Sequence, residues 1–147
     1  MGWIAVVGTL AGTVIGMIGT IAGQRVAASA AESRERLQRR AALRGERKTA
    51  VDAFLEAAQE TEVAAGSRES LSDTEKAHVA KQLWSRHKQL TLICSDELST
   101  AADDLANKLG HCLWHGTPEG QRVYEVIADH TRLFRQAAKA ELTWSEQ

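Results

Sequence analysis

The first long apolar run of the chain covers residues 2–23, contains no charged side chain and ends at Gln24 and Arg25. A helix needs about 20 apolar residues to cross a bilayer. We therefore predict a transmembrane helix over residues 1–24. Trp3 and Arg25 suit its two membrane interfaces, where aromatic and basic residues gather.

Small residues gather on one face of this predicted helix. At about 100° per residue, its glycines project into a single narrow stripe, and the bulky residues occupy the remaining arc. The stripe consists of Gly8, Gly12, Gly16, Gly19 and Gly23. Such a stripe lets two helix backbones approach closely in lipid, although glycine is common in membrane helices in general. We expect this glycine zipper to pack against another helix, most simply that of a second copy. A lone anchor is the alternative.

A polar helical pattern follows over residues 25–48. Large apolar residues are few in this stretch beyond Leu37 and Leu43. Two Glu–Arg pairs at i,i+4 spacing, which begin at Glu32 and Glu35, favour a helix. A heptad register places Arg44 in the apolar column, so a coiled coil is not favoured. We predict a solvated, basic helical stalk that continues the transmembrane helix.

Amphipathic helical patterns fill residues 49–147 and predict a compact domain. The first apolar face ends near Gly66. The residues from Ser72 to Glu75 have capping-box spacing, Ser95 suits an N-cap, and Thr117-Pro118 suits the start of the last helix. The inward-facing residues expected in the later helices are Val79, Leu83, Leu90, Ile93 and Cys94; Leu98, Ala102, Leu105, Leu109, Cys112 and Leu113; and Val123, Tyr124, Ile127, Phe134, Ala138 and Leu142. Short connections then predict an antiparallel bundle of three or four helices.

The composition agrees with an all-α fold. The 147 residues include one proline, and 25% of them are charged. Alanine is abundant and aromatic residues are few, which is typical of helical proteins. The roughly 120 residues beyond the anchor are enough for one small domain. We therefore predict an N-terminal transmembrane helix that continues into a stalk, followed by a small antiparallel helical bundle.

Charge separates the stalk from the domain. Residues 24–48 carry a net charge of +5 and residues 49–147 carry −6, within an overall charge of −1. Because basic residues beside a membrane helix stay in the cytoplasm, we expect the N-terminus outside the cell and the domain inside. A cleaved secretory signal is less favoured, because no basic residue precedes the apolar run and the run is too long. Two thiols in helical sequence, Cys94 and Cys112, suit a reducing compartment.

The charge distribution also bears on partners. An acidic domain argues against nucleic acid, because phosphate binding needs clustered cations. Arginines of the stalk could attract anionic lipid headgroups, although setting the topology is their simpler role. The arginines concerned are Arg34, Arg36, Arg39 and Arg40. We expect membrane lipid and a second copy, or another membrane protein, as partners.

Candidate chemistry is sparse. His111 and His115 lie one helical turn apart, as two ligands of one metal ion would. Cys112 belongs to the apolar column, however, and two ligands alone hold zinc weakly. No serine or cysteine can be paired with a histidine from spacing, and the sequence contains no glycine-rich phosphate loop. We predict no catalytic residues, no bound cofactor and no metal site.

The layout of the chain resembles a known group of proteins. The similarity covers the glycine-rich segment, the arginine-rich stalk and three later stretches. These stretches are residues 51–58 (VDAFLEAA), 92–98 (LICSDEL) and 133–142 (LFRQAAKAEL). The chain resembles uncharacterised single-pass helical membrane proteins of actinobacteria, which implies a bacterial cell-membrane protein with a cytoplasmic helical head. The group carries no named activity.

These observations favour an interaction protein over an enzyme. We expect a membrane-anchored scaffold that self-associates or docks a partner through its glycine-striped helix. A small pore-forming or membrane-perturbing protein, in which several copies pack their glycine faces, is the alternative. A metal-dependent enzyme that uses His111 and His115 is the third possibility.

Overall fold

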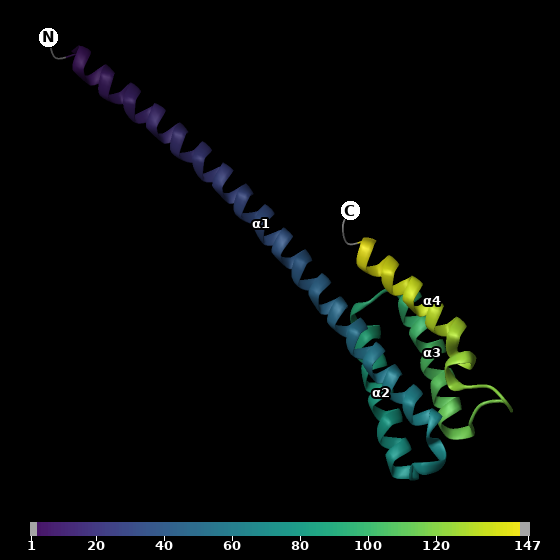
Figure 1. Ribbon diagram of the computed structural model, residues 1–147. Helices are drawn as coiled ribbons and strands as arrows, with labels where there is room; N and C mark the ends of the chain where they lie inside the picture. The colour runs from purple at the N-terminus through teal and green to yellow at the C-terminus, as the bar shows by residue number, and fades with distance from the viewer. Residues whose placement is uncertain (1–2, 145–147) are drawn as a thin grey trace. The chain divides into compact units, whose positions relative to one another are not determined.

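The computed structural model describes the backbone of residues 3–144 and the side chains of residues 31–143. Within these limits all regular structure is helical, which confirms the predicted all-α class (Figure 1). The elements are α1 (Trp3–Gly66), a short 3-10 helix η1 (Arg68–Ser70), α2 (Asp73–Ile93), α3 (Asp96–His115) and α4 (Val123–Trp144).

The chain divides into two compact units between Ala41 and Ala42. This division falls inside the stretch 25–48 that we assigned to the stalk. In the first unit, all side chains from 31 to 41 are exposed. They bury no apolar face, so this part of α1 is held by its own backbone hydrogen bonds and local side-chain pairs.

The predicted transmembrane segment falls mainly outside the described side chains. Its backbone is helical from Trp3 onward as part of α1, but the side chains of residues 3–30 lie outside the described range. Among the described residues, none of the helices has the length and apolar character that crossing a membrane requires.

The second unit is an antiparallel four-helix bundle. The C-terminal part of α1 lies beside α2, α3 and α4 (Figure 1), and α3 packs against both α2 and α4. The ring of Phe54 on α1 contacts the ring of Phe134 on α4 at a centroid distance of 5.0 Å, so α1 and α4 also pack against each other. Short connections make each helix run opposite to the previous one, as predicted.

The core confirms most of the predicted inward positions. All six residues predicted inward on α3, from Leu98 to Leu113, are buried, as are Leu83 and Leu90 on α2. Thr61 is also fully buried, and its hydroxyl donates to the carbonyl of Ala57 at 2.7 Å. That bond removes most of the cost of placing a hydroxyl among apolar side chains.

The predicted caps of α2 and α3 are confirmed. Ser72 forms a full capping box with Glu75, in which each side chain bonds the other residue's backbone N–H. Ser95 accepts a hydrogen bond from the backbone N–H of Leu98 at the start of α3. Each cap satisfies a backbone donor that the first helical turn leaves unpaired.

The predicted start of the last helix is wrong. Thr117 and Pro118 do not begin α4, which starts at Val123. The intervening residues form a turn in which Gln121 N–H donates to the Pro118 carbonyl, and Gly120 adopts a φ of +79°. That left-handed conformation suits glycine and interrupts a right-handed helix.

The side chain of Tyr124, which was predicted to face inward, is exposed. Tyr124 is 52% exposed and its hydroxyl donates to Glu125, because it sits in the first turn of α4, beside the outer end of the bundle. Cys94 caps α2 in an extended conformation, is half-buried and packs against the core, as predicted.

Candidate functional site

The residues predicted to pack in the membrane cannot be placed from their side chains. Trp3, Arg25 and the glycines of the stripe have helical backbone within α1, but they precede residue 31, where the described side chains begin. Packing through Gly8, Gly12, Gly16, Gly19 and Gly23 therefore stays a prediction.

The four stalk arginines predicted to meet lipid are all exposed on α1. Arg36 pairs with Glu32 and Arg39 pairs with Glu35, each at i,i+4 spacing. Such exposed pairs contribute about 0–1 kcal/mol, so an anionic partner can displace the glutamates at small cost. Arg34 and Arg40 have no ion pair with any described residue. Their guanidinium groups are open to solvent.

A polar ring closes the end of the bundle where residues 47, 94 and 141 meet, which we call the Arg47 end. The Arg47 guanidinium lies 3.0 Å from the Glu141 carboxylate and also donates to the Ile93 carbonyl at 3.0 Å. The second carboxylate oxygen of Glu141 accepts from the Ser95 backbone N–H at 3.2 Å. The ring thus ties α1, the α2–α3 connection and α4 together.

Cys94 lies within this ring, between Ile93 and Ser95. A cavity of about 440 Å³ opens here and is lined by Arg47, Cys94 and Glu141 among others. Burial raises the pKa of the Cys94 thiol, the Glu141 carboxylate raises it further, and Arg47 partly opposes both effects. Because the thiolate is the reactive form, the site holds Cys94 in its less reactive state.

Sequence reasoning missed the ring. Arg47 was counted only among the basic residues of the stalk, and Glu141 follows an alanine-rich stretch of α4 with no cue to its partner. Their proximity arises only when α1 and α4 pack side by side. The signal available in the sequence was Glu141 itself, a charged residue close to the buried face of α4.

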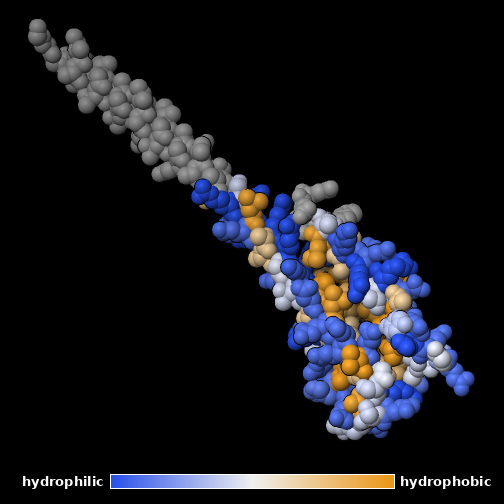
Figure 2. Space-filling model, in the orientation of Figure 1, coloured by the Kyte–Doolittle hydropathy of each residue, from blue (hydrophilic) through white to orange (hydrophobic). Residues whose placement is uncertain are grey.

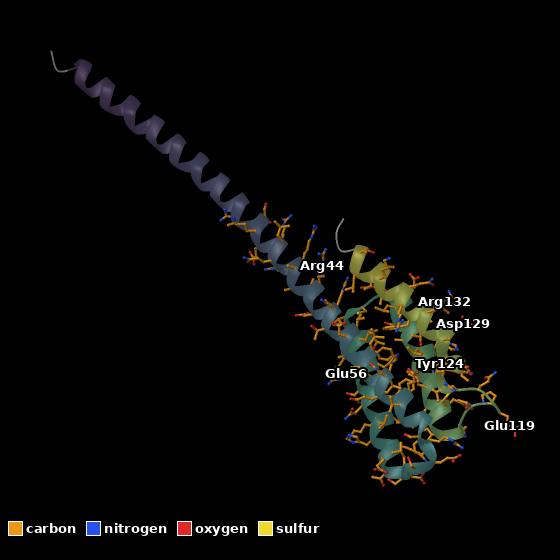
Figure 3. All side chains as sticks on the ribbon, in the orientation of Figure 1. Arg44, Glu56, Glu119, Tyr124, Asp129 and Arg132 are labelled. Atoms are coloured by element: carbon orange, nitrogen blue, oxygen red, sulfur yellow. The ribbon has the colours of Figure 1, made fainter. Side chains whose placement is uncertain are left out.

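A larger hollow lies at the opposite end of the bundle, near Gly66. It measures about 680 Å³ and is formed by the end of α1, η1 and the segment that leads into α4. Val63 is 68% exposed beside it, and Tyr124 projects from α4 next to the connection that carries Glu119 (Figure 3). Arg68 crosses this end and donates to the Trp114 carbonyl at 3.1 Å. The lining of this hollow mixes apolar and charged side chains.

His87 occupies a partly buried position at the core rim. Its ring lies 5.3 Å from Trp84 and 6.3 Å from Phe54, measured between centroids. Its Nε2 lies 3.6 Å from Asp103 and has no hydrogen-bond partner among the described residues. The contacts with two aromatic rings indicate a packing role for this histidine.

His111 and His115 come together on the last turns of α3. Their ring centroids are 4.9 Å apart and the ring planes are inclined by 39°. Both side chains are exposed, whereas Cys112 between them is fully buried and points into the core. The residues that the structure describes contain no group of three or more metal-ligating side chains. The pair is therefore at most a two-ligand site.

The surface of the bundle combines hydrophilic residues with apolar ones gathered between the helices on the face seen in Figure 2.

Comparisons of the chain with protein families, curated proteins and solved structures find no match. The function must therefore be argued from the residues themselves.

Proposed function

We propose that the protein is a non-enzymatic, single-pass membrane protein that self-associates through its glycine-striped helix and presents the bundle as an interaction surface in the bacterial cytoplasm. The observation that carries this proposal is the uncharged run of residues 2–24 with five glycines on one helical stripe. Close backbone approach is the main source of helix association in lipid, and only small residues permit it.

The stalk supports the proposed orientation. Eight basic residues lie between Arg25 and Lys48, directly after the apolar run. Basic side chains placed there favour retention of the following domain in the cytoplasm. The exposed guanidinium groups of Arg34 and Arg40 would meet anionic headgroups at the inner membrane surface.

The bundle supports an interaction role through the end near Gly66. The Gly66 end offers a hollow beside exposed Val63 and Tyr124, where a partner segment could bury apolar surface. The Arg47 end is internally satisfied by charged hydrogen bonds. A helical body with an exposed hollow of this size is suited to binding another protein.

Photo-cross-linking in native membranes tests the role of the stripe. A photoreactive amino acid replaces Ala5, which shares the stripe on a helical wheel. The chain should fractionate with membranes and give a cross-linked dimer on illumination. Replacing Gly12 and Gly16 by isoleucine should abolish the dimer, because the added side chains hold the two backbones apart.

A matched control adds bulk to the opposite arc of the same helix. Val7→Leu with Val14→Leu should leave both membrane recovery and the dimer unchanged. A dimer of equal yield in the glycine variant would show that the stripe is not the contact. Recovery of the intact chain in the soluble fraction would remove the membrane anchor from the proposal.

A further inference from the structure

His111 and His115 form a pair of neighbouring imidazole rings that the proposed function does not use. The two residues lie four positions apart near the end of α3 (Asp96–His115). Side chains four positions apart in a helix lie on the same face, one above the other, so these two rings are neighbours. This spacing accounts for the short distance between the two rings.

The ring separation fits shared coordination of one ion. Imidazole nitrogens bind zinc at about 2.0–2.1 Å, which puts the metal about 3.2 Å from each ring centre. For nitrogen–metal–nitrogen angles of about 90–109°, the two centroids must then be about 4.5–5.2 Å apart. The observed separation is 4.9 Å. Both rings are thus already spaced as a chelating pair.

The surroundings leave the ring nitrogens open to an ion. Both side chains are exposed, and neither ring has a hydrogen bond or an ion pair with another described residue. Coordination therefore requires no existing contact to break. Water molecules can complete the coordination shell, since the position faces solvent.

From this geometry we propose that His111 and His115 form a two-histidine surface site for a divalent transition-metal ion such as Ni²⁺, Cu²⁺ or Zn²⁺. Imidazole ligands suit these ions, whereas Mg²⁺ and Ca²⁺ prefer oxygen ligands. The site is independent of the membrane anchor and of the glycine stripe. With two protein ligands and open positions, it binds reversibly and can accept a further ligand from a partner.

Trp114 provides a built-in reporter for this site. It lies between the two histidines in sequence and is 42% exposed. The test uses the full chain in detergent micelles, without a polyhistidine tag, at pH 7.5. Ni²⁺ is added while tryptophan fluorescence is recorded, and calorimetry gives the stoichiometry. We expect saturable quenching with one ion per chain and no response to Mg²⁺, which prefers oxygen ligands.

Two substitutions and one control decide the assignment. His111→Gln and His115→Gln should each weaken Ni²⁺ binding at least about tenfold, the loss that even an outer partner of a metal ligand causes. His78→Gln, an exposed histidine on α2 that contacts Gln82, should leave binding unchanged. Circular dichroism checks that each variant keeps its helix content. Equal Ni²⁺ affinity in the wild type and in the variant that combines His111→Gln with His115→Gln would overturn the proposal. The absence of saturable binding up to millimolar Ni²⁺ would overturn it as well.

Discussion

The guanidinium of Arg47 and the carboxylate of Glu141 lie 3.0 Å apart and join the first and last helices of the bundle. The Glu141 side chain is only 7% exposed, whereas Arg47 is 37% exposed. A carboxylate that deep in the structure is tolerated because both of its oxygens are engaged, one by Arg47 and one by the Ser95 N–H. The buried charge of Glu141 is therefore stabilised by Arg47.

Breaking this pair should destabilise the bundle. Arg47→Met leaves the Glu141 carboxylate with an unpaired charge, and Glu141→Gln leaves the guanidinium with a neutral partner. We expect each to lower the free energy of unfolding by about 1–3 kcal/mol, the cost of an unsatisfied buried polar group. The measurement is chemical denaturation of the full chain followed by circular dichroism.

A double-mutant cycle separates the interaction energy between Arg47 and Glu141 from the contribution of their other contacts. If the two residues act together, the double variant should lose less than the sum of the single losses. Strict additivity would mean that Arg47 and Glu141 contribute through other contacts. Arg40→Met, an exposed arginine on the same helix, serves as the control and should change stability little.

The reactivity of Cys94 should report on the same ring. The raised pKa of its thiol reduces the thiolate fraction near neutral pH, so alkylation should be slow and should accelerate as pH rises toward and above 9. Glu141→Gln removes the negative charge that raises this pKa, so the rate at pH 8 should increase. Arg47→Met removes the opposing positive charge and should slow the reaction.

The measurement follows iodoacetamide labelling by mass spectrometry in a Cys112→Ser background. Circular dichroism at the labelling pH establishes that each variant is folded. If Glu141→Gln and Arg47→Met change the rate in the same direction, exposure of the thiol and not electrostatics controls it.

The capping box at the start of α2 predicts a defined response to acid. Hydrogen bonds from the Ser72 side chain and backbone lower the pKa of the Glu75 carboxyl below its ordinary value of 4.5. The folded state therefore binds this proton less readily than the unfolded state. Stability from the capping box should be complete above that ordinary value and should be lost as pH falls through the lowered pKa.

Denaturation curves recorded between about pH 3 and about pH 7, in steps of about one pH unit, check this effect. Glu75→Gln should flatten the acid limb relative to the wild type, because the amide does not titrate. Glu69→Gln, an exposed residue of η1, is the control. An acid limb of unchanged slope in Glu75→Gln would assign the response to other carboxylates.

Features that lie within one helix could be predicted from the sequence, whereas contacts between helices could not. The capping box at Ser72, the cap at Ser95 and the apolar column of α3 were all predictable, because each lies within a few turns of one helix. The start of α4 was not, since Thr117-Pro118 is a good helix start and only the left-handed Gly120 shows that a turn comes first. The Arg47–Glu141 ring could not be predicted, because it exists only after α1 and α4 have packed.

Two glycines at the end of α3 should respond oppositely to the same substitution. Gly110 lies inside the helix, and a Cβ added there would meet nothing within 4 Å. Gly110→Ala should therefore stabilise the protein by about 0.5–1 kcal/mol, since alanine loses less backbone entropy in a helix. Gly116 has a φ of +84°, and an added Cβ would lie 3.0 Å from the Arg68 guanidinium. Gly116→Ala should destabilise the protein by about 1–3 kcal/mol through its backbone alone, because a positive φ combined with its ψ of −173° is essentially restricted to glycine.

Gly120→Ala separates the two contributions at Gly116. Gly120 also has a positive φ, of +79°, but an added Cβ would find open space. If backbone strain dominates, Gly116→Ala and Gly120→Ala should lower the denaturation midpoint by similar amounts. A larger loss at Gly116 would mean that Arg68 is displaced from the Trp114 carbonyl, and Arg68→Ala should then remove the difference. Stabilisation by Gly116→Ala would contradict the left-handed end of α3.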